Sequence, residues 1–207
     1  MASRKRMTRD EAKAATRQKI LQAALEVFAH KGYHRAIVDD IVRVSGTSKG
    51  AVYHHFPTKE ALFIALVDEF ASHLATTVAE AIHREHGALG KVEGALRGGL
   101  ETFARHRQLA RLLLLEAVSL GRTYETKRAE VHSRFARLIK TYLDEAVAEG
   151  SIPPLDTEVA TLAWLGAVNE VVIQWLQTGQ PDLITRARPT LTTVLLRSIG
   201  ARDSRST

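Results

Sequence analysis

The chain has 207 residues, of which 45% are hydrophobic and 25% are charged, close to the average for soluble globular proteins. This composition excludes collagen-like, mucin-like and wholly disordered chains. Lys and Arg number 29 against 23 for Asp and Glu, and the whole excess lies in residues 1–60, which hold 12 basic and 6 acidic side chains. The asymmetry indicates that the N-terminal segment faces a polyanion, while the rest of the chain has a different task.

Cysteine is absent from the sequence, which excludes disulfides, thiolate nucleophiles and Cys-ligated zinc. No segment reaches the roughly 18 unbroken apolar residues of a membrane span. A leading candidate, residues 159–168, is interrupted by Asn169 and Glu170. No apolar stretch follows the basic N-terminus, so it lacks the form of a secretory signal. We therefore expect a cytoplasmic protein without a membrane partner.

Apolar residues recur at helical spacing along the whole chain, and no period-2 alternation bounded by turn residues predicts a strand. The pattern predicts a first helix that carries the apolar stripe from Ile20 to Phe28. Two short helices follow, over residues 38–45 and about 49–55, separated by a turn at Gly46. Thr58 can cap the next helix.

The next predicted helix is long, some 25 residues, and crosses out of the basic region with apolar side chains from Leu62 to Ile82. After a break at residues 87–90 we expect helices over about 91–106, 108–120, 123–149, 156–178 and 187–199. The predicted fold is all-α, with a small three-helix head of residues 8–60 and a larger helical body of residues 61–200.

The two short helices around Gly46 have the proportions of a helix-turn-helix, in which a glycine-containing turn joins two helices. The second helix carries Lys49, Tyr53 and His54, which can donate hydrogen bonds to phosphates and base edges. Gly50 lets the helix backbone approach DNA closely. A basic three-helix unit of this kind predicts DNA binding; the alternative is a small helical subdomain with a solvated basic face.

Many residues of this region stand at the fixed spacing of a known signature. They are Gly32, Tyr33, Ile41, Ser45, Gly46, Ser48, Lys49, Gly50, Val52, Tyr53, His54, His55, Phe56, Lys59, Glu60, Ala61 and Leu62. Over about residues 16–66 the chain closely resembles the TetR family of bacterial repressors; the rest matches that family only in being helical, apolar and of suitable length. The resemblance implies a homodimer whose two heads bind adjacent major grooves of double-stranded DNA and whose body binds an inducing small molecule.

The resemblance also implies where DNA is bound. Thr47, Ser48, Lys49, Gly50, Tyr53 and His54 occupy positions where the family's recognition helix meets base edges or nearby phosphates. We expect His55 and Lys59 to contact phosphates, because Lys59 starts the long helix, where the helix dipole also favours an anion. The implied function is a ligand-responsive transcriptional repressor, released from its operator by a small apolar effector.

Two features depart from the family pattern. Ile37 stands where the family usually has a Thr or Ser that caps the second helix and touches a phosphate. Loss of a hydroxyl cap costs roughly 1 kcal/mol, and we expect Asp39 and Asp40 to offset part of it through the helix dipole. Val42 and Val44 replace the usual alanines and indicate a repacked core.

An effector pocket in the body is expected to be mostly apolar, so that an acyl chain or an aromatic compound would suit it equally. Trp164 and Trp175 belong either to the core or an interface, or to a ligand-stacking surface. The expected pocket residues are Phe103, Leu112, Leu113, Tyr124, Phe135, Trp164 and Gln174. Glu170 lies in an apolar stretch, where an unpaired carboxylate is costly. It either forms an ion pair in the core or dimer interface, or fixes a polar group of the effector.

Dimerisation is expected through the last two helices, as a four-helix bundle across a two-fold axis. The small residues Ala163, Gly166 and Ala167 permit close approach of the helices. The apolar residues that supply contact area are Leu191, Val194, Leu195 and Ile199.

Other classes of function have weaker support. Residues 46–50 match the G-x-S-x-G nucleophile elbow, but that motif needs a preceding strand and later Asp and His partners. His83 and His86 supply two imidazoles, whereas a strong metal site has three or four ligands. We therefore expect no enzyme activity, metal or cofactor. The remaining alternative is a helical small-molecule-binding or interaction protein without specific DNA binding.

Overall fold

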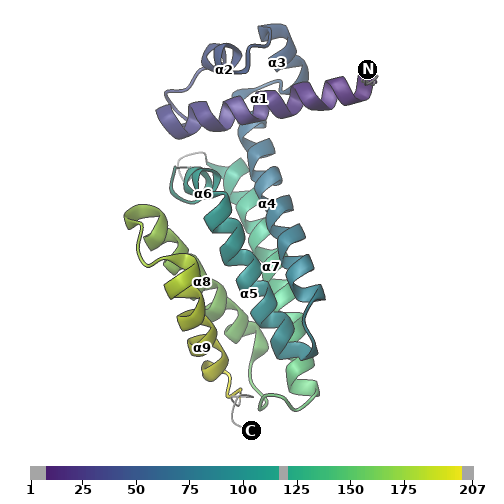
Figure 1. Cartoon of the computed structure of the whole chain (residues 1–207), viewed down its shortest axis with the longest axis vertical. Helices are drawn as coiled ribbons and strands as arrows, with labels where there is room; N and C mark the ends of the chain where they lie inside the picture. Colours follow the sequence, from purple (N-terminus) through teal and green to yellow (C-terminus); the bar gives the residue numbers. More distant parts are fainter. Residues whose placement is uncertain (1–7, 117–120, 202–207) are drawn as a thin grey trace, which may run out of the picture.

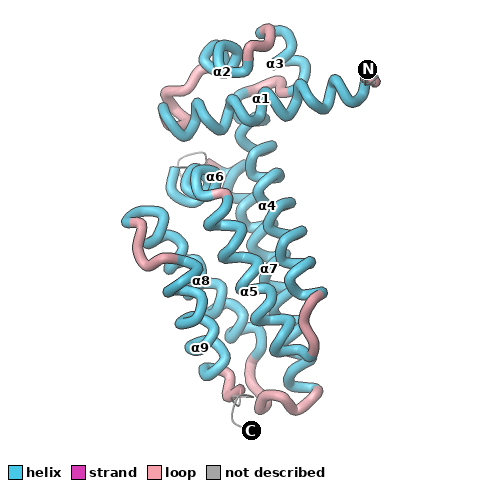
Figure 2. Tube along the Cα trace, viewed as in Figure 1, coloured by secondary structure: helices cyan, strands magenta, loops and turns pink. Residues whose placement is uncertain are grey.

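The computed structural model of the chain describes residues 8–116 and 121–201. These residues form helices joined by loops, and no strand occurs among them (Figure 2). A small three-helix head lies across one end of a longer helical body, and one long helix joins the two parts (Figure 1). The predicted all-α fold, with a head and a larger body, is confirmed.

The head consists of α1 (Arg9–Lys31), α2 (Val38–Ser45) and α3 (Lys49–His55), and both short helices have the predicted bounds. Gly46 ends α2 in the left-handed conformation with a φ of 60°, which glycine adopts without steric cost. α2 and α3 lie on the side of α1 that faces away from the body (Figure 1). The buried core of the head includes Ile20, Ala24, Phe28, Ile41, Val52 and Phe56.

The long helix α4 (Lys59–His83) runs from the head into the body (Figure 1). Thr58 caps it, because its hydroxyl accepts a hydrogen bond from the amide of Ala61 at 3.0 Å. Near the head end, the ring of Phe63 lies edge-on to that of Tyr124, with 5.9 Å between the ring centroids. The apolar core is therefore continuous from the head into the body.

The body contains α5 (Gly87–Arg105), α6 (Arg107–Arg111), the π-helical segments η1 (Leu112–Glu116) and η3 (Leu183–Ala187), α7 (Arg122–Ala148), α8 (Thr157–Thr178) and α9 (Arg188–Ser198). The predicted break at residues 87–90 is wrong, since α5 already begins at Gly87 and the break falls on residues 84–86. The predicted helix 108–120 is divided between α6 and η1, and its last four residues lie outside the described part of the chain.

Two glycines set the close approach of α5 to α4. A Cβ added at Gly94 would lie 2.9 Å from the carbonyl oxygen of Ala81, and one added at Gly98 would lie 2.9 Å from that of Thr77. A Cβ at Gly99, by contrast, meets nothing within 4 Å. Gly99 therefore faces open space inside the body rather than the neighbouring helix.

Two helices, α4 and α8, are long and apolar enough to cross a membrane by length and composition alone. Both helices contain charged residues, such as Asp68 in α4 and Glu170 in α8, so neither is an unbroken apolar run. Core helices satisfy the same test, and α4 contributes buried side chains from Leu62 to Ile82. α8 is less buried, and it exposes the apolar side chains of Val159 and Leu162.

Candidate DNA-binding and effector-binding sites

The N-terminus of α2 is stabilised without a hydroxyl cap. Ile37 makes no side-chain cap, but its amide donates to Oδ2 of Asp40 at 3.4 Å. The buried carboxylate of Asp40 also pairs with Lys31 at 2.7 Å and Arg43 at 2.6 Å. The hydrogen bond from Lys31 is the main reason that the pKa of Asp40 lies below its ordinary value. Asp40 thus holds α2 to α1 and takes over part of the missing cap.

The start of α3 is ordered by its own hydroxyl groups. Oγ of Ser48 caps the helix by accepting from the amide of Ala51 at 3.1 Å. The hydroxyl of Thr47 is hydrogen-bonded to that of Ser45 at 2.8 Å. Lys49 is exposed and pairs with Asp39 of α2 at 2.8 Å. Hydroxyl and ammonium donors therefore converge where α2 and α3 meet.

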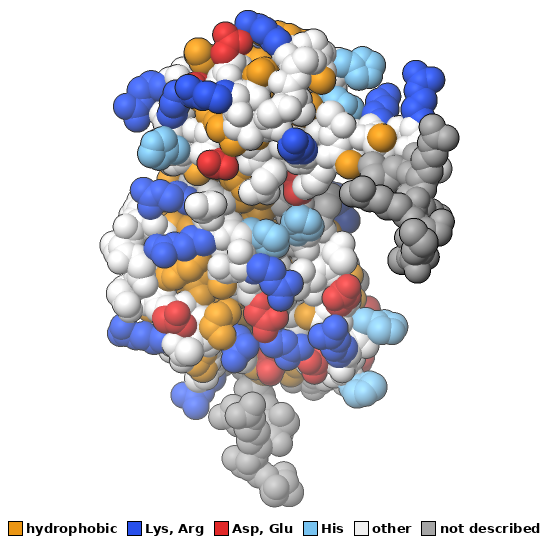
Figure 3. Space-filling view, turned by 45° about the horizontal axis from the view of Figure 1, so that its top comes forward, with side chains coloured by type: hydrophobic (Ala, Val, Ile, Leu, Met, Phe, Trp, Pro, Cys, Tyr) orange, Lys and Arg blue, Asp and Glu red, His pale blue; other side chains and the backbone are white. Residues whose placement is uncertain are grey.

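The remaining α3 residues form the outer surface of the head. Tyr53 is 45% exposed, Gly50 and His54 are exposed, and His55 is half-buried. Burial is the main reason that the pKa of His55 lies below its ordinary value, and the neighbouring His54 lowers it further. Lys and Arg side chains predominate over acidic ones on the head surface that Figure 3 shows. The predicted residues from Thr47 to His55 thus lie at the start of α3 and along it, and their contact with DNA stays a prediction.

Lys59 departs from its predicted role. Its ammonium group donates to the carbonyl oxygens of Tyr33 at 2.9 Å, His34 at 3.4 Å and Ala36 at 3.0 Å, and it lies 4.4 Å from the centroid of the Tyr33 ring. An ammonium group has three protons, and all three are used inside the head. Lys59 therefore fixes the loop between α1 and α2 in this structure instead of offering its charge to a phosphate.

The two lysines are expected to differ when each is replaced by alanine. Lys59→Ala removes three charge-assisted hydrogen bonds and should lower the free energy of unfolding by about 1–3 kcal/mol, with a small change in the salt dependence of DNA binding. Lys49→Ala should leave unfolding within about 0.5 kcal/mol of wild type and cost about 1–3 kcal/mol on specific DNA. Urea unfolding and fluorescence anisotropy with specific and random DNA measure both effects. A destabilised Lys49→Ala and an unchanged Lys59→Ala would reverse these roles.

The body contains a cavity of about 210 Å³ between α4, α5, α7, α8 and α9. Its lining is almost entirely aliphatic and aromatic. It consists of Val67, Phe70, Ala71, Leu74, Val78, Val92, Ala95, Leu96, Gly99, Phe103, Leu113, Leu114, Tyr124, Arg128, Val131, His132, Phe135, Leu138, Ile139, Trp164, Leu165, Val168, Asn169 and Leu195. An engineered apolar cavity of about 150 Å³ stays dry and binds benzene, so a space of this size and lining suits an apolar ligand.

Five of the expected pocket residues line this cavity, namely Phe103, Leu113, Tyr124, Phe135 and Trp164. Leu112 is buried but does not line the cavity, and Gln174 is exposed on α8. Glu170 is also exposed, and Oε1 accepts from Nε2 of Gln174 at 3.4 Å. Glu170 therefore lies outside the core and the cavity of the single chain, and its roles in a dimer interface or toward the effector stay predictions.

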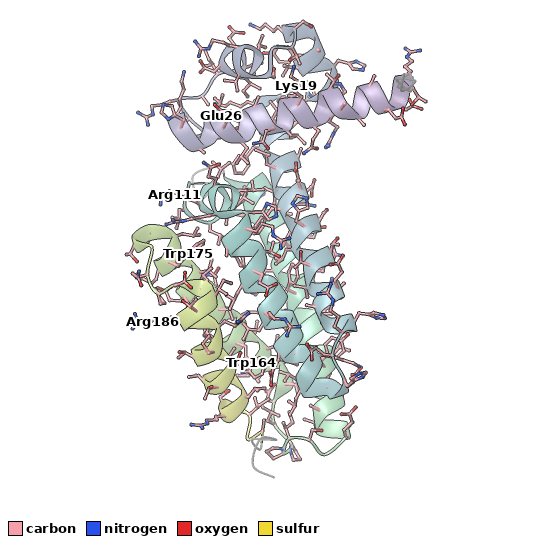
Figure 4. The ribbon with its side chains drawn as sticks, viewed as in Figure 1. Lys19, Glu26, Arg111, Trp164, Trp175 and Arg186 are labelled. Carbon is pink, nitrogen blue, oxygen red and sulfur yellow. The ribbon has the colours of Figure 1, made fainter. Side chains whose placement is uncertain are left out.

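The two tryptophans have different surroundings. Trp164 lines the cavity, and its indole donates to the hydroxyl of Ser198 on α9 at 3.2 Å. Trp175 lies near the opposite end of α8 (Figure 4), where the guanidinium of Arg107 is 4.8 Å from its ring centroid. Trp164 therefore contacts the space available to a ligand, and Trp175 joins α8 to α6.

α8 and α9 each expose apolar side chains. Val159 is 61% exposed, Leu162 52% and Val194 56%. Gly166 is also exposed, and a Cβ added there meets nothing within 4 Å. Three residues predicted to supply contact area lie inside instead. They are Leu191, Leu195 and Ile199, at 7%, 5% and 3% exposure.

Comparison of the sequence with family profiles and with known proteins shows to which family the chain belongs. The profile of "Bacterial regulatory proteins, tetR family" matches residues 20–66, and that of "Tetracyclin repressor-like, C-terminal domain" matches residues 85–182. The transcriptional repressor AcnR of Corynebacterium glutamicum is 31% identical over 166 residues, which cover 79% of this chain and 83% of AcnR. The chain belongs to the TetR family of bacterial transcriptional regulators.

Two further relatives share this TetR architecture over most of their length. The fatty acid metabolism regulator protein of Bacillus subtilis is 26% identical over 174 residues, covering 83% of this chain and 90% of that protein. The solved structure of the fatty acid degradation regulator FadR from Bacillus halodurans has a TM-score of 0.78 at 25% identity, covering 86% of this chain and 97% of FadR.

Membership of the TetR family makes the chain a ligand-responsive transcriptional regulator and not an enzyme. Regulators of this family are soluble proteins that bind DNA and small-molecule effectors. Among residues 8–116 and 121–201, no group of three or more His, Cys, Asp or Glu side chains is placed to hold a metal ion.

Sequence reasoning missed the polar part of the cavity lining, which includes Arg128, His132 and Asn169. A signal was present on α7, since Arg128 and His132 precede Phe135 at helical spacing and so share its face. Only the fold shows that this face passes along a cavity.

Proposed function

We propose that this TetR-family protein is a cytoplasmic, homodimeric repressor that leaves its operator when a compound with a linear acyl chain enters the body cavity. The observation that carries the proposal is the 210 Å³ apolar cavity, which is formed by the same α4 that enters the head. We retain a head of residues 8–60 and a body of residues 61–200 as the two functional units.

DNA recognition is assigned to the outer surface of the head. Lys49 and Gly50 open α3, and Thr47 and Ser48 directly precede it. We assign these four residues to base edges in the major groove or nearby phosphates. Tyr53, His54 and His55 supply further donors, which we assign to bases or nearby phosphates. The excess of basic residues in the first 60 positions supports attraction to a polyanion.

An acyl chain is preferred to an aromatic compound on two grounds. The lining residues of α7 extend from Tyr124 to Ile139, which at 1.5 Å per residue is a path of about 22 Å. Such a path fits a linear chain better than a compact ring. The relative from B. subtilis is named a fatty acid metabolism regulator, which supports the same class of compound.

The test begins with selection of binding sites from a random DNA pool. Enriched sites should contain two half-sites about 10 base pairs or a multiple apart, as expected for a dimer that reads one face of the duplex. Gel shifts should then show release of the operator by acyl compounds but not by aromatic compounds of similar apolar area. Failure to enrich any sequence at two salt concentrations would favour the alternative, a helical small-molecule-binding or interaction protein without specific DNA binding.

A further inference from the structure

The residues that line the cavity differ in exposure. Val78, Val92, Trp164 and Leu195 are 3%, 5%, 5% and 5% exposed, so the part that they line is closed. Arg128 and His132 also line the cavity, yet both are exposed. Their part of the lining therefore opens to solvent and forms the mouth.

The cavity lining includes basic side chains and no acidic ones among the described residues. Arg128 supplies a guanidinium and His132 an imidazole, and no Asp or Glu of this part of the chain lines the cavity. The neighbouring Lys127 is already occupied, since it pairs with Asp68 at 2.9 Å and Glu130 at 3.1 Å. Arg128 has no ion pair among the described residues. A guanidinium with free donors thus lies beside an apolar cavity.

The other polar groups of the lining are less suited to bind a charged group. The hydroxyl of Tyr124 donates to the carbonyl oxygen of Leu113, and burial raises the pKa of this tyrosine. It therefore serves the fold rather than a ligand. Asn169 on α8 is exposed and can donate an amide hydrogen bond, but it carries no charge.

We infer that the effector is an amphipathic anion, whose negatively charged head group is bound by Arg128 and His132 at the mouth while its apolar tail fills the closed part of the cavity. This inference rests on the proposed function and assigns to these two residues the selection of an anionic over an uncharged acyl compound. A guanidinium binds carboxylate and phosphate oxygens in a matching fork geometry, so either group satisfies the site.

Three probes with the same ten-carbon tail test the inference by isothermal titration calorimetry. Decanoate carries a carboxylate, decanoyl-CoA carries phosphates, and 1-decanol is uncharged. At least one anion should bind the wild-type protein about tenfold more tightly than decanol, and added salt should reduce that difference. If decanoate shows this preference, the head group is a carboxylate; if only decanoyl-CoA shows it, the head group is a phosphate.

Variants at the mouth show which residue makes the selection. Arg128→Gln should remove most of the tenfold preference and leave decanol binding unchanged, whereas Arg128→Lys should restore part of it because the charge returns. His132→Gln should weaken the same anion by a smaller factor. Arg134→Gln is the matched control, since Arg134 is exposed on α7 but does not line the cavity. Thermal unfolding of each variant reports whether its fold is intact.

The outcomes separate this inference from the proposed function. Equal binding of all three probes to the wild type, or an equal loss for all three in a folded Arg128→Gln variant, overturns the role of Arg128 and leaves an acyl effector standing. Release of the operator by decanol at the same concentration as by the anions has the same meaning. Failure of every probe to bind the wild type overturns the acyl effector and the head-group site together.

Discussion

Val194→Asp should convert the protein from a dimer to a monomer and lower its operator affinity at least 100-fold. Val194 is 56% exposed on α9, and Leu162 is 52% exposed on α8. If the dimer forms through these exposed apolar side chains, as proposed, it would bury the new carboxylate without a partner, which is strongly unfavourable. A monomer also loses the second head, and a linked second contact raises affinity by roughly 10²–10⁴. Light scattering and anisotropy measure the two effects.

The controls for this prediction use the same substitution elsewhere. Ala79→Asp places the same charge on an exposed position of α4 and should leave a dimer of normal affinity. Leu195→Asp is unsuitable as an interface test, because Leu195 is 5% exposed and lines the cavity. A Val194→Asp protein that remains dimeric at micromolar concentration would place the interface on another surface.

Gly99→Leu should produce a repressor that no longer responds to its effector. Gly99 lines the cavity, and a Cβ there meets nothing within 4 Å, so the new side chain occupies the space of the ligand tail. Effector affinity should fall at least tenfold, since each displaced methylene is worth about 0.8 kcal/mol. The free energy of unfolding should rise by about 1–3 kcal/mol, because a helical glycine is removed and an apolar side chain is buried. Calorimetry and urea unfolding measure these changes.

Gly99→Ala is the matched control for the filled cavity. It supplies the helix-propensity gain of about 0.5–1 kcal/mol but fills little of the space, so effector binding should remain close to wild type. Operator binding without effector should be unchanged in both variants. Normal effector binding by a folded Gly99→Leu protein would mean that the ligand occupies a different site.

The helices of the head could be predicted closely because each has a local signal. Gly46 and Thr58 mark helix ends by chemistry that does not depend on distant contacts, and both work as predicted. Lys59 could not be predicted in the same way. Its three carbonyl partners, at residues 33, 34 and 36, are more than twenty positions away in the sequence, and only the packing of α4 beneath the head brings them together.

The body was predicted in outline but not in detail. Helix periodicity identifies which residues share a face, yet it does not say whether that face meets the core, a cavity or a partner. Leu195 and Val194 are adjacent on α9, and one is buried while the other is exposed. Glu170 lies in an apolar stretch but points outward. These differences depend on the rotation of α8 and α9 against the rest of the body.

A physical route connects the contact surface of the body with the head. α6 contacts both α1 and α8, and Figure 4 shows Arg111 and Trp175 where α6 meets α8. Arg111 donates to the carbonyl oxygen of Leu176 at 2.8 Å, and Arg107 lies over Trp175. A second contact joins the head directly to α4, since Nε2 of Gln18 in α1 donates to Oε1 of Glu69 in α4 at 3.0 Å. Direct contacts therefore link α4 and α8, which both line the cavity, to the head.

The central claim is that the cavity and the head are energetically coupled, and reciprocal binding measurements test it most directly. Effector affinity is measured by calorimetry with and without saturating operator, and operator affinity with and without saturating effector. Coupling of about 1–3 kcal/mol should weaken each ligand about 5- to 150-fold when the other is bound, and the two factors must be equal. Equal effector affinity with and without operator would contradict the account.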